Sequence, residues 1–246
     1  MSAWIPALAS VTAVSLAALV GLLALPLAPA SLARLASRLV SFAVGALLGD
    51  VCLHLLPECL APGAPAARAL ALVSAGFLAF AALERGLRRR PRRDARALPG
   101  LALVNLAGDA LHNFLDGTLI GASWLGGPAL GASTTLAVLA HELPQELGDF
   151  GVLVHSGLGL RRALLFNLGS AASAVVGTVA TLLAGAGLQQ DLVAALLPVA
   201  AGGFLYIALV DLLPELARDR RPRARGEQLA LILCGIGVMA LLALAQ

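Results

Sequence analysis

Two short polar stretches lie inside otherwise apolar segments, and both carry side chains that can bind a metal ion. The first is HNFLDG at 112–117, and the second is HELPQELGD at 141–149. An ionisable group in the middle of a bilayer costs roughly 2.5–3.5 kcal/mol on insertion scales, so such a concentration favours function over packing. The sequence therefore indicates a polar site inside a membrane-embedded region.

Helical spacing places the groups of the first stretch on one surface. His112 and Asp116 are four residues apart, so they share a helix face and lie one turn from each other. Asn113 lies beside them, and Asp109 precedes them by about a turn. Neutral imidazole suits zinc, copper, iron and nickel, whereas carboxylate and amide oxygens accept harder ions.

The second stretch has the same character. His141 and Gln145 share one helix face, Glu142 and Glu146 share the adjacent one, and Asp149 follows three residues later. Carboxylates this close in hydrocarbon repel one another unless a cation or protons lie between them. A buried hydrogen-bonded network is the alternative to a metal site. The predicted ligands are His112, Asn113, Asp116, His141, Glu142 and Gln145.

Composition places the chain in a membrane. Of its 246 residues, 59% are hydrophobic and 13% are charged, and the mean hydropathy is +0.91. Soluble domains have about 45–50% apolar and 25% charged residues. The three cysteines, Cys52, Cys59 and Cys234, form no CxxC pair, so neither a disulfide framework nor a thiolate zinc site is indicated.

About 20 apolar residues span the hydrocarbon core, and the chain offers eight such stretches in one polytopic domain, 1–246. The connections are short, and only 87–98, which is rich in arginine, could form a longer hydrophilic loop. The sequence predicts an all-α membrane protein. Its spans are 3–25, 36–57, 68–86, 99–122, 131–155, 163–186, 192–216 and 227–245.

Arginine predicts the orientation. With the N-terminus outside, all basic residues except Arg68 fall in the inner loops, and cytoplasmic loops are enriched in such residues. Both termini are then extracytoplasmic, in the inner membrane of a cell. The basic run at 88–93 is a topology signal that touches anionic headgroups, and no nucleic-acid partner is expected.

The sequence LLPE occurs at 55–58 and again at 212–215, preceded by His54 and Asp211 respectively. The first copy ends span 2 at the outer face, and the second ends span 7 at the inner face. This pattern predicts an inverted repeat, with helices 1–3 (about 3–86) matching helices 6–8 (about 163–245) around helices 4 and 5 (about 99–155). Secondary transporters are often built in this way, with the substrate site at the repeat interface.

A third polar-x-x-Pro sequence occurs at 141–144. Each proline removes a backbone donor and frees the carbonyl four residues earlier, at Leu53, Ala140 and Val210. Membranes tolerate such breaks only where protein or water satisfies the backbone. The breaks either create a polar path or are ordinary proline kinks.

The chain resembles the ZIP (Zrt/Irt-like protein) family of metal-ion transporters in four motifs. HNFLDG at 112–117 resembles the family's span-4 motif, and HELPQELGDF at 141–150 is similar to a span-5 motif written HExPHExGD. GDVCLHLLPE at 49–58 and AGGFLYIALVDLLPEL at 201–216 resemble its span-2 and span-7 signatures. The resemblance covers nearly the whole chain.

The resemblance implies an eight-helix homodimer that takes up divalent metal, zinc foremost, into the cytoplasm. It implies that His112, Asp116, His141, Glu142 and Gln145 are transport-site ligands and that Asn113 completes a second ion position. Access and exit routes would be lined by His54, Glu58, Asp211 and Glu215, and Asp109, Glu146 and Asp149 are further pathway residues.

This chain departs from the family pattern in three places. Many relatives have His or Glu where this chain has Gln145, whose neutral oxygen is a weaker ligand. The loop at 87–98 has no histidine, which argues against metal sensing there, and span 6 has no acidic residue to complete a second metal site.

The sequence thus predicts a transporter of divalent ions without a cofactor, with zinc first and Fe²⁺, Mn²⁺, Cd²⁺ and Co²⁺ as further substrates. The alternative is an intramembrane zinc metalloprotease using His141 and Glu142, because HELPQ begins like H-E-x-x-H. Gln145 at the fifth position and Pro144 within the motif count against it. A structural or lipid-binding membrane protein also fits the composition but leaves the polar stretches unexplained.

Overall fold

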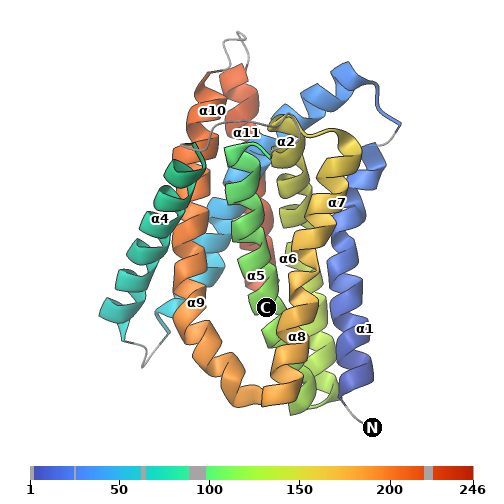
Figure 1. Ribbon diagram of the computed structural model, residues 1–246, viewed down its shortest axis with the longest axis vertical. Coiled ribbons are helices and arrows are strands. Elements are labelled where there is room, and N and C mark those ends of the chain that lie inside the picture. Colours follow the sequence, from blue (N-terminus) through green and yellow to red (C-terminus); the bar gives the residue numbers. More distant parts are fainter. Residues whose placement is uncertain (1–2, 25, 62–64, 89–97, 219–223, 246) are drawn as a thin grey trace.

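The computed structural model describes residues 3–24, 26–61, 65–88, 98–218 and 224–245, and these ranges hold helices and turns without a strand. They form eight long helical segments that run alternately along one bundle axis (Figure 1). The segments are α1 (Trp4–Ser15) with the 3-10 turn η1 (Leu16–Ala24); α2 (Pro29–Asp50) with η2 (Val51–Leu55) and α3 (Leu56–Cys59); α4 (Ala66–Arg88); α5 (Gly100–Gly126); α6 (Pro128–His155); α7 (Leu160–Ala171) with α8 (Ser173–Ala184); α9 (Ala186–Tyr206) with η3 (Ile207–Leu212) and α10 (Leu213–Ala217); and α11 (Ala224–Ala245).

The predicted all-α membrane protein is confirmed. Six of the helical segments are long and apolar enough to cross a bilayer by themselves. The other two are α5 and α6, which carry the two polar stretches. They have 27 and 28 residues, or about 40 Å of helix, which exceeds the hydrocarbon thickness of about 30 Å. Both lie within the bundle, where α5 packs against α6, α8 and α9, and α6 also packs against α2.

The second segment begins earlier than the sequence prediction of residue 36. Pro29 occupies the first turn of α2, where its missing N–H costs nothing, and the helix runs from there without interruption. Arg34 and Arg38 therefore lie on a helix and not in a loop. The apolar stretch alone could not locate this start, because the first turns of α2 extend beyond the body of the bundle (Figure 1).

Arginine-bearing helix ends gather at one end of the bundle. The start of α2 (Arg34, Arg38), the start of α7 (Arg161, Arg162), the end of α10 and the start of α11 lie at the top of Figure 1. The start of α4, with Arg68, lies at the opposite end. The loop prediction for 87–98 falls mostly on 89–97, outside the described residues.

The prolines of the two LLPE copies are accommodated by π-helical turns. One π turn, η2, ends just before Leu56-Pro57, and the other, η3, ends just before Leu213-Pro214. In each turn the N–H of the residue before proline bonds to the carbonyl five residues earlier, at Val51 or Ala208. Inserting one residue into the turn lets the helix continue past proline. Pro144, by contrast, lies inside an unbroken α6.

Two close helix crossings also match between the halves. Gly45 of α2 and Gly202 of α9 each lie 12 residues before their proline. A Cβ on Gly45 would meet the carbonyl oxygen of Ile232 in α11 at 2.0 Å, and one on Gly202 would meet that of Val73 in α4 at the same distance. In the predicted repeat α2 corresponds to α9 and α4 corresponds to α11. Each glycine-bearing helix thus packs against the third helix of the other half. The 3+2+3 inverted repeat stays a prediction, which these matched features support.

Candidate metal site

Four of the predicted ligands form one compact cluster at the α5–α6 interface. His112 and Asp116 come from α5, and His141 and Glu142 come from α6. One ligand atom from each lies within 4.8 Å of all the others. All four residues are buried, with exposed fractions of 7% or less. The two polar stretches therefore meet, as their spacing on separate helices predicted.

His141 has a defined orientation. Its Nδ1 lies 3.1 Å from the carbonyl oxygen of Ala137, one turn earlier, so Nδ1–H donates to that carbonyl. This bond leaves Nε2 as the ligand nitrogen. Nε2 lies 2.9 Å from Oδ2 of Asp116, and such a contact between an imidazole nitrogen and a carboxylate needs a proton or a cation between the two atoms.

His112 and Glu142 complete the cluster. The Nε2 atom of His112 lies 3.5 Å from Oε1 of Glu142 and 3.6 Å from Oδ2 of Asp116. Within the described part of the chain, both ring nitrogens of His112 and both oxygens of Glu142 lack a hydrogen bond. Buried polar atoms are rarely left in this state, so these atoms indicate a ligand. The ring of Phe204 from α9, 5.2 Å from that of His112, forms an apolar wall beside them.

Asn113 and Gln145 are buried next to the cluster. The Nδ2 group of Asn113 donates to Oδ1 of Asp109 at 2.7 Å, so this amide is directed along α5 and away from His141. Gln145, 4% exposed, follows His141 by one turn, and neither of its amide atoms has a hydrogen bond among the described residues. Both amide oxygens thus remain available as ligands.

Asp109, Glu146 and Asp149 continue the polar surface beyond the cluster. Each is at most 5% exposed and accepts a hydrogen bond from an asparagine. Asn113 bonds to Asp109, Asn105 donates to Asp149 at 2.9 Å, and Asn167 of α7 donates to Glu146 at 2.5 Å. The polar surface therefore extends from the cluster toward the arginine-bearing end of the bundle, where α5 begins and α6 ends.

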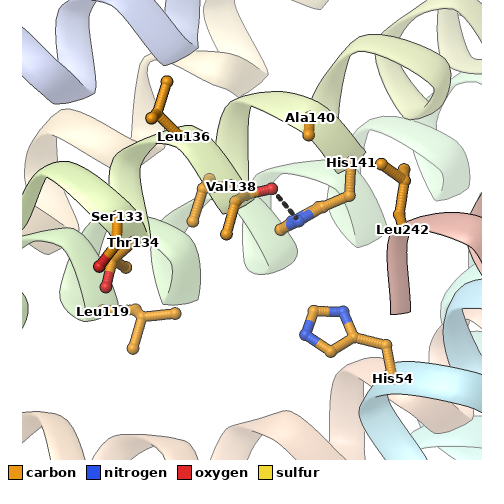
Figure 2. Close-up of a pocket in the computed structure, with 10 residues that line it drawn as sticks. His54, Leu119, Ser133, Thr134, Leu136, Val138, Ala140, His141 and Leu242 are labelled. Carbon is orange, nitrogen blue, oxygen red and sulfur yellow. Dashed lines mark hydrogen bonds between the residues drawn. The ribbon is translucent and has the colours of Figure 1, made fainter. Parts of the chain in front are cut away.

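A pocket of about 570 Å³ leads to the cluster from the opposite end. His54 and His141 face each other across it (Figure 2), with ring centroids 5.3 Å apart. The rest of its lining is mostly apolar. The lining residues are His54, Leu119, Ser133, Thr134, Leu136, Ala137, Val138, Ala140, His141 and Leu242.

The π turn η2 presents His54 to this pocket. The Nδ1 atom of His54 lies 3.2 Å from Oδ1 of Asp50, which is 1% exposed, so the carboxylate fixes the imidazole and leaves Nε2 free. Glu58 is exposed one turn further on, near the end of α3.

The remaining two pathway residues lie at the arginine-bearing end. Asp211 is half-buried in η3, and Glu215 is half-buried in α10. Glu215 contacts His155, the last residue of α6, at 3.6 Å, and it accepts a hydrogen bond from Arg218. These contacts join the end of α6 to the end of α10.

Three residues that hold predicted site residues were missed by the sequence analysis: Asp50, Asn105 and Asn167. Asp50 precedes its partner His54 by four residues, so helical spacing could have found it. Asn105 had no such signal, because its partner Asp149 lies on another helix. Asn167 had no such signal, because only the packing of α7 against α6 brings it to Glu146.

The fold and the cluster define a class: a polytopic helical membrane protein with a metal-binding type of site in its interior. A family model described as ZIP Zinc transporter matches residues 92–243. Zinc transporter ZIP13 of Pongo abelii is 34% identical over 271 aligned residues, which cover 99% of this chain and 80% of that protein. The chain belongs to the ZIP family of zinc transporters.

Two other relatives are more similar over a shorter part. Zinc transporter ZIP4 of Mus musculus is 48% identical over 54% of this chain, and Zinc transporter SLC39A7 of Mus musculus is 43% identical over 57%. The aligned parts make up only 20% and 31% of those proteins. Members of this family are transporters and not enzymes, so the metalloprotease alternative is wrong.

Proposed function

We propose that this protein carries divalent metal ions, zinc foremost, into the cytoplasm, and that His112, Asp116, His141 and Glu142 bind the ion on its way. The observation that carries the proposal is the compactness of these four ligands in the interior of a ZIP-family chain. Gln145 and Asn113 supply amide oxygens at the edge of this site, and Gln145 is its weakest ligand.

The ligand chemistry supports zinc as the substrate. Two imidazoles and two carboxylates form a set that zinc accepts in tetrahedral geometry, and the two negative charges balance the ion. The same set accepts Fe²⁺, Mn²⁺, Co²⁺ and Cd²⁺, so geometry and availability decide among them. The ligands release protons when the ion binds, because a proton and a metal compete for the same lone pairs.

The two ends of the bundle differ in a way that supports import. Arginine-bearing ends mark the cytoplasmic side, and the pocket between His54 and His141 reaches the cluster from the other side. Toward the cytoplasmic side Asp109, Glu146 and Asp149 are buried, which supports a path that is closed at that end. An ion enters by the pocket, and movement of one helix group against the other opens the inner side.

The proposed topology follows from this orientation, and the proposed homodimer rests on the resemblance to the ZIP family. All eight helical segments cross the inner membrane, both termini are extracytoplasmic, and the protein works as a homodimer. Fusing alkaline phosphatase to the C-terminus tests the orientation, because the fused enzyme is active only outside the cytoplasm. Cross-linking in membranes tests the homodimer.

Zinc influx into proteoliposomes tests the site. Wild type and His112→Ala are compared with a zinc-sensitive dye enclosed in the vesicles. We expect influx through the variant to fall to the background of empty vesicles. Ser123→Ala is the matched control, since Ser123 is a buried polar residue on the same helix whose hydroxyl donates to the backbone carbonyl of Ile120. Equal influx through wild type and His112→Ala contradicts the assignment.

A further inference from the structure

Glu84 is a buried acidic residue near the end of α4, a helix most of whose residues are exposed on the outside of the bundle. It is 7% exposed, whereas its neighbours Leu83 and Arg85 are both exposed. The helix ends about one turn later, so the carboxylate could have turned toward water and the headgroups. An acidic side chain buried within a membrane span is costly and marks a candidate for function.

The partner of Glu84 is Tyr206, the last residue of α9. The tyrosine hydroxyl donates a hydrogen bond to Oε2 of Glu84. The ring of Phe77, two turns earlier on α4, packs edge-on against the tyrosine ring, with centroids 5.3 Å apart. Tyr206 is 4% exposed, and a buried tyrosine needs such a partner for its hydroxyl. α4 therefore holds this side chain at both its ring and its hydroxyl.

Residues on either side of Tyr206 contact α5, the helix that carries His112. The ring of Phe204 lies 5.2 Å from that of His112. A Cβ on Gly108 would lie 2.9 Å from Cδ1 of Ile207, so Ile207 packs closely on α5 one turn before His112. Phe204 and Ile207 are three residues apart and share a helix face. The end of α9 is thus held between α4 and α5 directly beside the four-residue cluster.

Tyr206 also marks the point where the hydrogen-bond ladder of α9 changes. The π turn η3 begins at the next residue, Ile207, and carries Asp211. Such single π turns within helices are frequent at functional sites. The turn holds one residue more than an α turn, so the direction of Asp211 depends on where it begins. An anchored side chain immediately before the turn fixes that point.

The other π turn has a glycine where this one has its tyrosine. Tyr206 lies eight residues before Pro214, and the residue eight before Pro57 is Gly49. A Cβ on Gly49 would meet Cβ of Met239 in α11 at 2.9 Å, so close packing leaves no room for a larger side chain. The hydrogen bond therefore belongs to the π turn at the arginine-bearing end and distinguishes it from its counterpart.

We infer that Glu84 and Tyr206 are positioning residues for transport. Their hydrogen bond holds the junction of α9 and η3, which keeps Phe204 beside His112 and keeps η3 in the register that presents Asp211 to the inner path. The inference rests on the proposed function, because it assigns the pair to the passage of the ion through that site. The pair acts through η3 and not on the ion, so it sets the rate of passage and not the affinity.

Tyr206→Phe tests the inference, because it removes the hydroxyl and keeps the ring. Zinc influx into proteoliposomes is measured over a range of zinc concentrations, and zinc binding is measured by isothermal titration of the purified protein. We expect the maximal influx to fall about fivefold, the factor that corresponds to a typical hydrogen bond. The KM and the dissociation constant for zinc should stay within about twofold of wild type, because the ligands are unchanged.

Variants of α4 separate the hydrogen bond from packing. Glu84→Gln keeps an acceptor oxygen and should retain most of the maximal influx, whereas Glu84→Ala should lose as much as Tyr206→Phe. The double variant Glu84→Ala/Tyr206→Phe should lose no more than either single variant, because both remove the same bond. Phe77→Leu is the matched control, since it alters the contact with the same tyrosine ring and leaves the hydroxyl bond in place.

Three results would overturn the inference. The first is a wild-type maximal influx in Tyr206→Phe. The second is an equal loss of influx in Phe77→Leu, or in Glu84→Gln as in Glu84→Ala. The third is a loss of zinc binding together with influx in Tyr206→Phe, which would reduce the pair to a contact that stabilises the fold. A slower Tyr206→Phe with influx unaffected by His112→Ala would instead contradict the proposed site and leave the positioning role standing.

Discussion

His141 of α6 contacts Asp116 of α5 through Nε2 and Oδ2, 2.9 Å apart, and this contact joins the two polar stretches at the centre of the bundle. The imidazole is held from behind by the carbonyl of Ala137, so it cannot turn without losing that bond. We expect a metal ion that enters between Nε2 and Oδ2 to meet ligands already placed for it. Preorganised ligands lower the cost of binding.

Asp116→Asn separates the charge of this contact from its shape. Asparagine has nearly the same size and can donate to Nε2, so we expect the variant to fold and to keep α5 against α6. Zinc affinity should fall by at least about tenfold, or 1.4 kcal/mol, because one of two charged ligands is lost. Isothermal titration of zinc into the purified protein measures this. An unchanged dissociation constant would show that Asp116 does not bind the ion.

Zinc binding and influx should weaken as the pH falls. At lower pH the imidazoles and carboxylates of the cluster hold protons that zinc must displace, so the apparent dissociation constant rises by up to about tenfold per pH unit for each proton displaced. Influx is compared at pH 5.5 and 7.5, and proton release on zinc addition is followed with a pH-sensitive dye in weak buffer. Binding without proton release would show that the His141–Asp116 contact holds no exchangeable proton.

Gln145→His should change metal choice. Histidine replaces a neutral oxygen ligand by an imidazole one turn after His141, and imidazole favours zinc over manganese. We expect the variant to hold zinc more tightly and to discriminate more strongly against Mn²⁺ in a competition panel with Fe²⁺, Mn²⁺, Cd²⁺ and Co²⁺. If the order of metals is the same in wild type and variant, Gln145 does not tune selectivity.

Two glycines of α11 provide a matched test of packing. A Cβ on Gly235 would meet the carbonyl oxygen of Phe42 at 2.5 Å, whereas one on Gly237 would meet nothing within 4 Å. Gly235→Val should therefore destabilise the protein by about 1–3 kcal/mol through overpacking of α11 on α2. Gly237→Val should leave thermal unfolding in detergent nearly unchanged. Equal melting temperatures for the two variants would mean that α2 and α11 do not pack this closely.

Asp50→Asn should affect access to the site more than the passage of the ion. The carboxylate of Asp50 orients His54 at the pocket, and a neutral amide holds an imidazole less firmly. We expect the KM for zinc to rise several-fold with little change in the maximal rate. Cys52→Ser, an exposed position on the same π turn, is the control. A reduced maximal rate at unchanged KM would place Asp50 elsewhere in the cycle.

Much of this molecule could be predicted from the sequence, for reasons that differ between features. The helices follow from hydropathy, and the pairing of His112 and Asp116 follows from their four-residue spacing. The junction with His141 could only be expected, because no local rule fixes which faces of α5 and α6 meet. The π turns before Pro57 and Pro214 escaped prediction, since proline predicts a break and not the way in which the backbone repairs it. Asn167 escaped because its partner, Glu146, lies on another helix.

The polarity of α5 and α6 has a consequence for how the chain enters the membrane during synthesis. Neither helix is among those apolar enough to cross by itself, and a single residue, Gly127, connects them in a conformation with φ 129°. We therefore expect them to enter the bilayer as a hairpin, with each helix shielding the polar side of the other. The earlier helices must stay nearby to pack against this hairpin. A chain cut short after α5 should therefore fail to insert α5 into the bilayer. A chain cut short after α6 should insert both α5 and α6.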